Sequence, residues 1–161
     1  MAQQKPGFED FIGTVDSGSR DFVRALHGIF TEHGCKLEIK EAKSGYVVSY
    51  LLNRKTVMNY VFRRKGLLAR IYAGHIAGYM ELLESLPDAL AAQLRAAPDC
   101  KRLLNTAACN SKCAMGYDFI LQGRRLQKCR YNAFLIPVCE ENNPTIEALL
   151  TRELAFCGQK A

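Results

Sequence analysis

Residues 46–72 read YVVSYLLNRKTVMNYVFRRKGLLARIY, and this stretch predicts the centre of the fold. Its apolar and polar side chains alternate along strand-like segments, as they do in strands that bury one face. The short turns Asn53-Arg54-Lys55 and Lys65-Gly66 separate three such segments, and a fourth, residues 36–40, precedes them behind Ser44-Gly45. Segments of this kind joined by tight turns are typical of an antiparallel meander, so we expect four consecutive antiparallel strands.

On either side of the meander, apolar residues recur with the period of a helix. We expect helices at residues 19–33, 76–86, 88–96 and 144–156. Because strands occur in runs and do not alternate with helices, the predicted class is α+β. The expected architecture is an antiparallel sheet, made of the meander and a C-terminal hairpin, flanked by about four helices. The length suits a single domain over residues 1–161.

The C-terminal hairpin is predicted by residues 117–121 and 125–130, which are strand-like and flank Gln122-Gly123-Arg124. If the turn is centred on its glycine, Cys129 falls opposite about Tyr117. A further strand follows the hairpin, and its proline, which cannot donate a ladder hydrogen bond, predicts that this strand lies at a sheet edge.

The composition, 48% apolar and 24% charged, is that of a packed globular domain. No apolar run approaches the roughly 20 residues of a membrane-spanning helix, and no apolar region near the N-terminus marks an export signal. Seven cysteines without such a signal indicate a reducing compartment, so we expect mostly free thiols, a cytoplasmic location and no membrane partner. The net charge of +6 permits an anionic partner, but the basic residues are spread over turns. We expect nucleic-acid binding to be weak and non-specific at most.

No motif assigns an enzyme class, because the sequence lacks a glycine-rich phosphate loop, G-x-S-x-G and H-E-x-x-H. Of the three histidines, His27 and His33 are six residues apart and do not share a helix face as a metal pair would. His75 follows Gly74 where a predicted strand meets a predicted helix. Side chains at such junctions often line a cleft, so His75 is either a base or ligand there, or a cap or loop residue.

A cluster of cysteines is the strongest chemical signal in the chain. Cys109 and Cys113 form C-x3-C in a segment rich in small polar residues, and Cys129 lies on the second strand of the predicted hairpin. The hairpin would carry Cys129 back toward the loop, with Cys100 or His75 as a fourth ligand. Thiolates in a tetrahedral set suit zinc or an iron–sulfur cluster. The sequence therefore predicts a metal site at Cys109, Cys113 and Cys129, with zinc as the candidate cofactor.

Two other interpretations of these cysteines remain open. They are a reactive or redox thiol pair, whose pKa values nearby lysine and arginine side chains would lower, or they are structural free thiols. The remaining cysteines, Cys35, Cys139 and Cys157, are expected to be small buried apolar residues.

Part of the chain resembles a known family. The segments VVSY (47–50), LLARIY (67–72) and YMELLESLP (79–87) resemble the small YdhG-like domains of largely unknown function. The resemblance spans roughly residues 46–94. It implies a frataxin-like α+β shape, and one branch of that family has been linked to intracellular iron handling. The cysteine-bearing hairpin departs from the family pattern, and the resemblance implies no functional residue.

The predicted function is that of a binding module of small-molecule or metal-ligand type. Its expected pocket is an aromatic sheet face, if one helix leaves that face uncovered; otherwise the same side chains form the core. The residues of this face are Tyr46, Tyr50, Tyr60 and Phe62. The alternatives are a thiol-based enzyme or redox protein and a weak nucleic-acid-binding module.

Overall fold

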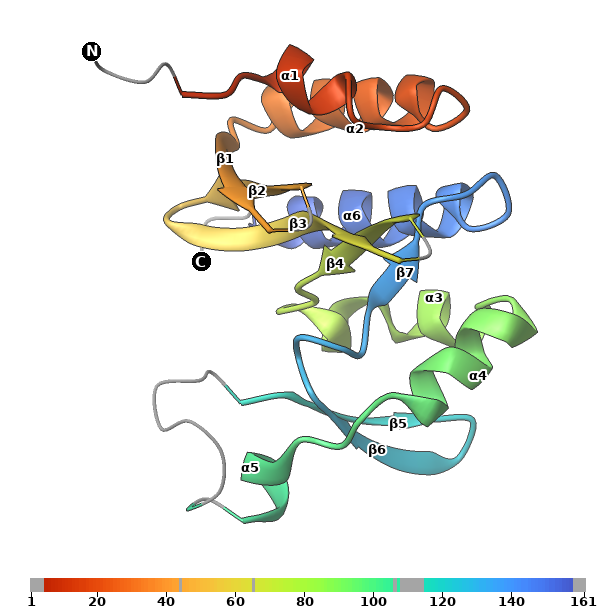
Figure 1. Cartoon of the computed structure of the whole chain (residues 1–161). Helices are drawn as coiled ribbons and strands as arrows, with labels where there is room; N and C mark the ends of the chain where they lie inside the picture. Colours follow the sequence, from red (N-terminus) through yellow and green to blue (C-terminus); the bar gives the residue numbers. More distant parts are fainter. Residues whose placement is uncertain (1–4, 44, 65, 106, 108–114, 158–161) are drawn as a thin grey trace.

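The computed structural model describes residues 5–43, 45–64, 66–105, 107 and 115–157. At its centre is a five-stranded antiparallel sheet with the strand order β1-β2-β3-β4-β7 (Figure 1). Its strands are β1 (Lys36–Ala42), β2 (Gly45–Leu52), β3 (Lys55–Arg63), β4 (Gly66–Ile71) and β7 (Leu135–Pro137). The predicted meander and α+β class are confirmed. As its proline predicted, β7 lies at a sheet edge, next to β4.

The expected helices are present. They are α2 (Arg20–Glu32), a 3-10 turn η1 (Ile76–Tyr79) that continues into α3 (Met80–Glu84), α4 (Asp88–Ala96) and α6 (Asn143–Cys157). Two short helices complete the described set, α1 (Phe8–Ile12) and α5 (Lys101–Leu104). The periodicity did not predict α1. Its position depends on distant contacts, because Phe8 stacks on His27 of α2 at 3.9 Å between ring centroids and Glu9 forms an ion pair with Arg24.

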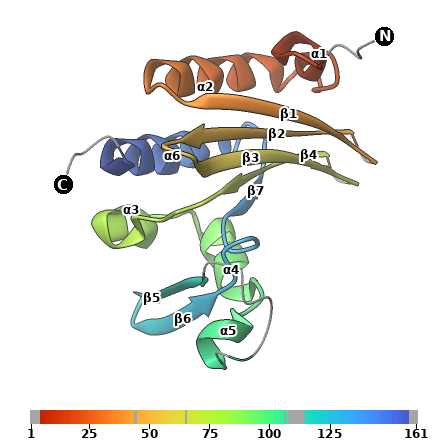
Figure 2. The ribbon, with the colours of Figure 1, turned by 90° about the vertical axis from the view of Figure 1, so that its left-hand side faces the viewer.

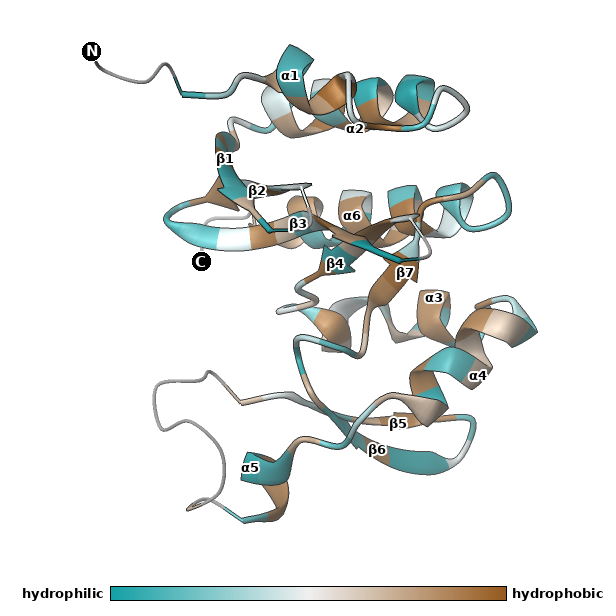
Figure 3. Cartoon of the chain, viewed as in Figure 1, coloured by the Kyte–Doolittle hydropathy of each residue, from teal (hydrophilic) through white to brown (hydrophobic). Residues whose placement is uncertain are grey.

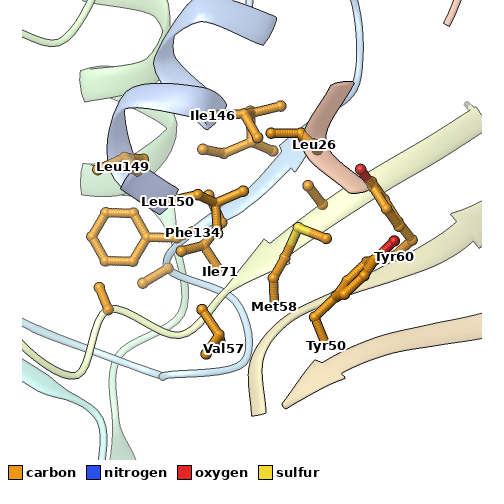
Figure 4. Close-up of a cluster of buried hydrophobic side chains, with 14 of the residues drawn as sticks. Leu26, Tyr50, Val57, Met58, Tyr60, Ile71, Phe134, Ile146, Leu149 and Leu150 are labelled. Carbon is orange, nitrogen blue, oxygen red and sulfur yellow. The ribbon is translucent and has the colours of Figure 1, made fainter. Parts of the chain in front are cut away.

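The core lies between one face of the sheet and the helices α1, α2 and α6. Met58 of β3 and Ile71 of β4 pack with Leu26 of α2 and Leu150 of α6, and all four are fully buried (Figure 4). The hydropathy colouring of Figure 3 shows hydrophilic and hydrophobic residues interleaved along α2, as expected of a helix with one buried face. Burial of this shared face joins the sheet and its helices into one unit.

The expected aromatic pocket does not exist, because helices cover that face of the sheet. Phe30 of α2 stacks on Tyr50 at 4.0 Å between ring centroids, and Phe11 of α1 lies 5.4 Å from Tyr60. Tyr50 and Tyr60 retain at most 1% of their surface, and both belong to the core. Tyr46 and Phe62 are partly buried and pack against the same cluster. The alternative interpretation of these four side chains, as core, is therefore correct.

The segment between β4 and β7, residues 72–134, is called the insert. It holds η1, α3, α4, α5 and the hairpin β5 (Tyr117–Leu121) and β6 (Arg124–Lys128). The hairpin forms its own two-stranded sheet and does not extend the main one. Figures 1 and 2 both show α4, α5 and the hairpin grouped on the side of the molecule away from α1 and α2.

The hairpin turn contains two residues, Gln122 and Gly123, both with positive φ angles (50° and 78°). A two-residue turn with this backbone matches the twist of the flanking strands. Tyr117 therefore pairs with Lys128. The expected pairing of Tyr117 with Cys129 is wrong by one position, because it assumed a three-residue turn.

Lys128 connects the hairpin to α4. Its side chain is 8% exposed, and Nζ donates to the backbone oxygens of Arg95 and Ala97 at 2.7 and 2.9 Å and to Asp99 Oδ1 at 3.0 Å. A buried ammonium is stable only when its hydrogens are paired, and these three acceptors do so at the C-terminal end of α4. No helix in the described ranges has both the length and the apolar character to cross a membrane.

Replacing Lys128 with Met should keep most of the side-chain volume and leave the partly buried carbonyls of Arg95 and Ala97 without this donor. We expect Lys128→Met to lower the free energy of unfolding, measured by urea denaturation, by about 1–3 kcal/mol. Lys36→Met, at an exposed lysine, is the matched control and should change it by no more than about 0.5 kcal/mol. Equal stability of the two variants would show that Lys128 does not join the hairpin to α4.

Candidate functional site

A cleft of about 740 Å³ opens where the β2–β3 turn, the end of β4, the start of the hairpin-to-β7 connection and the last turn of α6 meet. The side chains in its lining that carry chemistry are Lys55, Tyr72, His75, Arg130, Glu153 and Cys157. The volume lies within the range of small-molecule pockets. The cleft is therefore the candidate functional site of the described structure.

Three lining residues come together because of how α6 packs. Glu153 and Cys157 are four residues apart and so lie on one face of the helix. The apolar stripe of α6 packs on the sheet, which brings this face to the chain that leaves β4. There the backbone N–H of His75 donates to Glu153 Oε1 at 2.9 Å.

The Glu153 carboxylate is the centre of the site and is 3% exposed. Its Oε1 accepts hydrogen bonds from the backbone N–H of His75 and from Tyr79 Oη at 2.8 Å. Its Oε2 lies 2.6 Å from His75 Nδ1 and 3.3 Å from Cys157 Sγ, which donates to it. Several donors around one buried carboxylate offset the cost of removing its charge from water. They also orient the imidazole, since Nδ1 must carry the proton that it donates to the carboxylate.

The same carboxylate shapes the chemistry of its neighbours. Burial, reinforced by the hydrogen bond to Glu153 and by its negative charge, raises the pKa of the Cys157 thiol to about 12. Burial and Glu153 likewise raise the pKa of Tyr79 well above its ordinary value. Both groups therefore stay protonated at neutral pH and act as hydrogen-bond donors.

Phe156 forms one wall of the cleft. Its ring lies nearly parallel to the His75 imidazole, with centroids 5.9 Å apart and planes at 11°. The backbone of Gly78 lies directly beneath the phenyl ring, and a Cβ at position 78 would stand 2.3 Å from it. Only glycine at this position leaves space for Phe156 to pack beside His75.

His75, Glu153 and Cys157 form a group that could hold a metal ion. One donor atom from each, an imidazole nitrogen, a carboxylate oxygen and a sulfur, lies within 4.8 Å of the other two. His75 Nδ1 and Cys157 Sγ are 3.9 Å apart. Ligands bound to one zinc at about 2.0–2.3 Å stand roughly 3.3–3.6 Å from one another, so small side-chain movements would suffice.

The predicted cysteine site is only partly visible. Cys109 and Cys113 lie outside the described residues. Cys129 is half-buried, and its Sγ accepts a hydrogen bond from Asn132 Nδ2 at 3.4 Å. The metal site at Cys109, Cys113 and Cys129 stays a prediction. His75, one of its suggested fourth ligands, instead contacts Glu153 and Cys157.

Cys100, the other suggested fourth ligand, does lie near Cys129 in the backbone ladder. The two cysteines flank the bridge between Asp99 and Lys128, with the N–H of Cys100 bonded to Gln127 O and that of Cys129 bonded to Pro98 O. Cys100 Sγ accepts the N–H of Gly116 at 3.3 Å. Although burial opposes the shift, hydrogen bonds from the backbone N–H groups around it lower the pKa of the Cys100 thiol.

The sequence singled out His75 but missed its partners. Cys157 was expected to be an ordinary buried thiol, and Glu153 was not singled out. Their spacing of four residues was the available signal, although Cys157 lies one residue beyond the end of the helix predicted over residues 144–156. It becomes informative only once α6 is known to pack beside the end of β4.

The hydrogen bonds to Glu153 can be tested by removing its charge. Glu153→Gln places an amide N–H₂ against groups that are themselves donors, so the free energy of unfolding should fall by about 1–3 kcal/mol. Glu147→Gln makes the same change at an exposed position of α6 and should alter stability by no more than about 0.5 kcal/mol. If urea denaturation finds the two variants equally stable, the Glu153 network contributes nothing to folding.

Comparisons of this chain with protein-family models, with curated proteins and with solved structures found no match. The resemblance to YdhG-like domains therefore stays a prediction.

Proposed function

We propose that the protein is a binding module for a transition metal, held by His75, Glu153 and Cys157. One observation carries this proposal. An imidazole nitrogen, an oxygen of the buried Glu153 carboxylate and a thiol sulfur lie within 4.8 Å of one another in the lining of a cleft. Imidazole, carboxylate and thiolate together are ligands that zinc accepts, and zinc is the proposed ion. Three protein ligands leave one position of a tetrahedral ion for water or a small molecule.

The surroundings of the carboxylate support this proposal. Metal sites commonly orient a ligating carboxylate through further hydrogen bonds. Here Tyr79 Oη and the backbone N–H of His75 hold Oε1, while Oε2 faces the imidazole and the thiol. An ion would take the place of the two protons that now lie between Oε2, Nδ1 and Sγ. The thiol proton would be released, and the imidazole proton would move from Nδ1 to Nε2.

A thiol-based enzyme at this site has less support. A nucleophilic cysteine needs a lowered pKa, whereas burial and Glu153 raise the pKa of Cys157 to about 12. The site needs a reduced thiol, so we also propose a reducing compartment, the cytoplasm. Nucleic-acid binding remains proposed as weak and non-specific at most.

A second metal site, at Cys109, Cys113 and Cys129, is supported by one specific observation. Cys100 and Cys129 flank the same backbone bridge, and Cys100 receives N–H donors that stabilise a thiolate. Cys100 would be the fourth ligand of a structural zinc. The two proposals place metal on different cysteines, so one set of variants separates them.

Metal analysis by mass spectrometry, on protein purified without chelator, tests both sites. If the cleft binds zinc, Cys157→Ser and His75→Ala should each lose one equivalent and Cys129→Ser should not. If the cysteine cluster binds zinc, Cys129→Ser should lose one equivalent of zinc and Cys157→Ser should retain it. Cys139→Ser is the control, since Cys139 belongs to neither set. Wild-type protein that binds no zinc even after incubation with it would refute both proposals.

The cleft site also predicts a direction of pH dependence. With a pKa of about 12, the Cys157 thiol is protonated throughout the neutral range, so zinc binding must release its proton. Zinc affinity should therefore rise about tenfold for each unit of pH between 6 and 8, as measured by competition with a chromophoric chelator. In Cys157→Ser this dependence should become shallower. A pH-independent affinity would mean that Cys157 is not a ligand.

A further inference from the structure

Two cations of the cleft lack carboxylate partners. Lys55 is the first residue of β3, and Arg130 follows the end of β6. Among the described residues, neither has an Asp or Glu oxygen within 4.0 Å. Glu153 supplies the one carboxylate among the described lining residues, and it already accepts the hydrogen bonds of His75, Tyr79 and Cys157. The accessible charge of the cleft is therefore positive, which favours an anionic ligand.

The turn that presents Lys55 has a well-defined geometry. Asn53 and Arg54 form a two-residue connection with φ angles of 53° and 69°, and Leu52 pairs with Lys55 across it. This turn matches the natural twist of the two strands. The position of the Lys55 backbone at the rim of the cleft is therefore set by the β2–β3 hairpin.

Aromatic rings accompany the cations. The Arg130 guanidinium lies over the Tyr72 ring, with Cζ 5.2 Å from the centroid, and Tyr131 meets Tyr72 edge-on at 6.0 Å. Phe156 and the His75 imidazole lie parallel elsewhere in the lining. Flat side chains of this kind favour flat ligands, because stacked and edge-on contacts require planar groups.

We propose that the cleft binds a small planar molecule that carries a carboxylate or a phosphate. Lys55 and Arg130 bind the anionic group, and the rings of Tyr72, Tyr131 and Phe156 contact the flat part. The cleft volume of about 740 Å³ suits a ligand of this size. The inference goes beyond metal binding, since neither cation nor any of these three rings is a metal ligand.

A fluorescent probe tests the inference. The aromatic anion anilinonaphthalene sulfonate and its uncharged analogue N-phenylnaphthylamine differ in the sulfonate group alone, and the fluorescence of both rises on binding. The wild-type protein should bind the anion more tightly than the analogue. Lys55→Gln and Arg130→Gln should each weaken binding of the anion about three- to fivefold, as expected for one partly exposed ion pair, and leave binding of the analogue unchanged.

Arg64→Gln is the matched control, because it removes one positive charge beyond the opposite end of β3 from Lys55. It should change binding of the anion by less than about twofold, the small effect of a distant screened charge. Equal affinity for the anion and its analogue, or an anion affinity unaffected in both cleft variants, would overturn the proposal.

Competition identifies the anionic group. Displacement of the probe by phenyl phosphate but not benzoate assigns a phosphate ligand, and the reverse assigns a carboxylate. Displacement by neither overturns the proposal.

Repeating the titration with chelator-treated protein and with Cys157→Ser separates this inference from the metal site. Retained anion binding supports the two cations as the binding groups, whether or not the protein binds zinc. Anion binding that disappears with the metal, yet persists in Lys55→Gln and Arg130→Gln, would show that a metal ion holds the anion and would refute the inference.

Discussion

Burial of the Glu153 carboxylate is the constraint on which the candidate site depends. A charge with 3% exposure is tolerated only where donors surround it, and here they come from two separate parts of the chain. His75 and Tyr79 lie in the connection that leaves β4, and Cys157 lies one turn further along α6. The carboxylate thus joins the end of the sheet to the last helix. The cleft, its imidazole and its thiol occupy their positions because this charge must be paired.

Local sequence patterns predicted most of the fold. Alternation and tight turns identified β1 to β4, and apolar periodicity identified α2, α4 and α6, because each of these signals lies within a few neighbouring residues. The predictions failed where contacts between residues far apart in the sequence determine the structure. The position of α1 depends on Phe8 stacking against His27, and the aromatic face around Tyr50 became core because α1 and α2 cover it. An alternating strand predicts a buried face, but not whether helices or a ligand will cover it.

The site was less predictable than the fold for the same reason. His75 could be singled out from its place at the end of a strand, and Glu153 and Cys157 share a helix face through their spacing. Nothing local indicates that these two elements meet, since more than seventy residues separate them in sequence. Similarly, the cysteines at 100 and 129 are brought to the same ladder by the hairpin and by Lys128, whose hydrogen bonds to the end of α4 no local pattern indicates.

The place of the insert in the chain has a consequence for how the main sheet assembles. β4 and β7 are hydrogen-bonded neighbours, yet the whole insert lies between them in sequence. The meander can form from nearest-neighbour hairpins, whose loop-closure entropy is small. β7 can join only after a much longer loop closes, so pairing at this edge should be among the late events of folding. In a nascent chain, the exposed edge of β4 would remain open until the insert had been synthesised, and contacts of the growing chain with chaperones would be most useful during that interval.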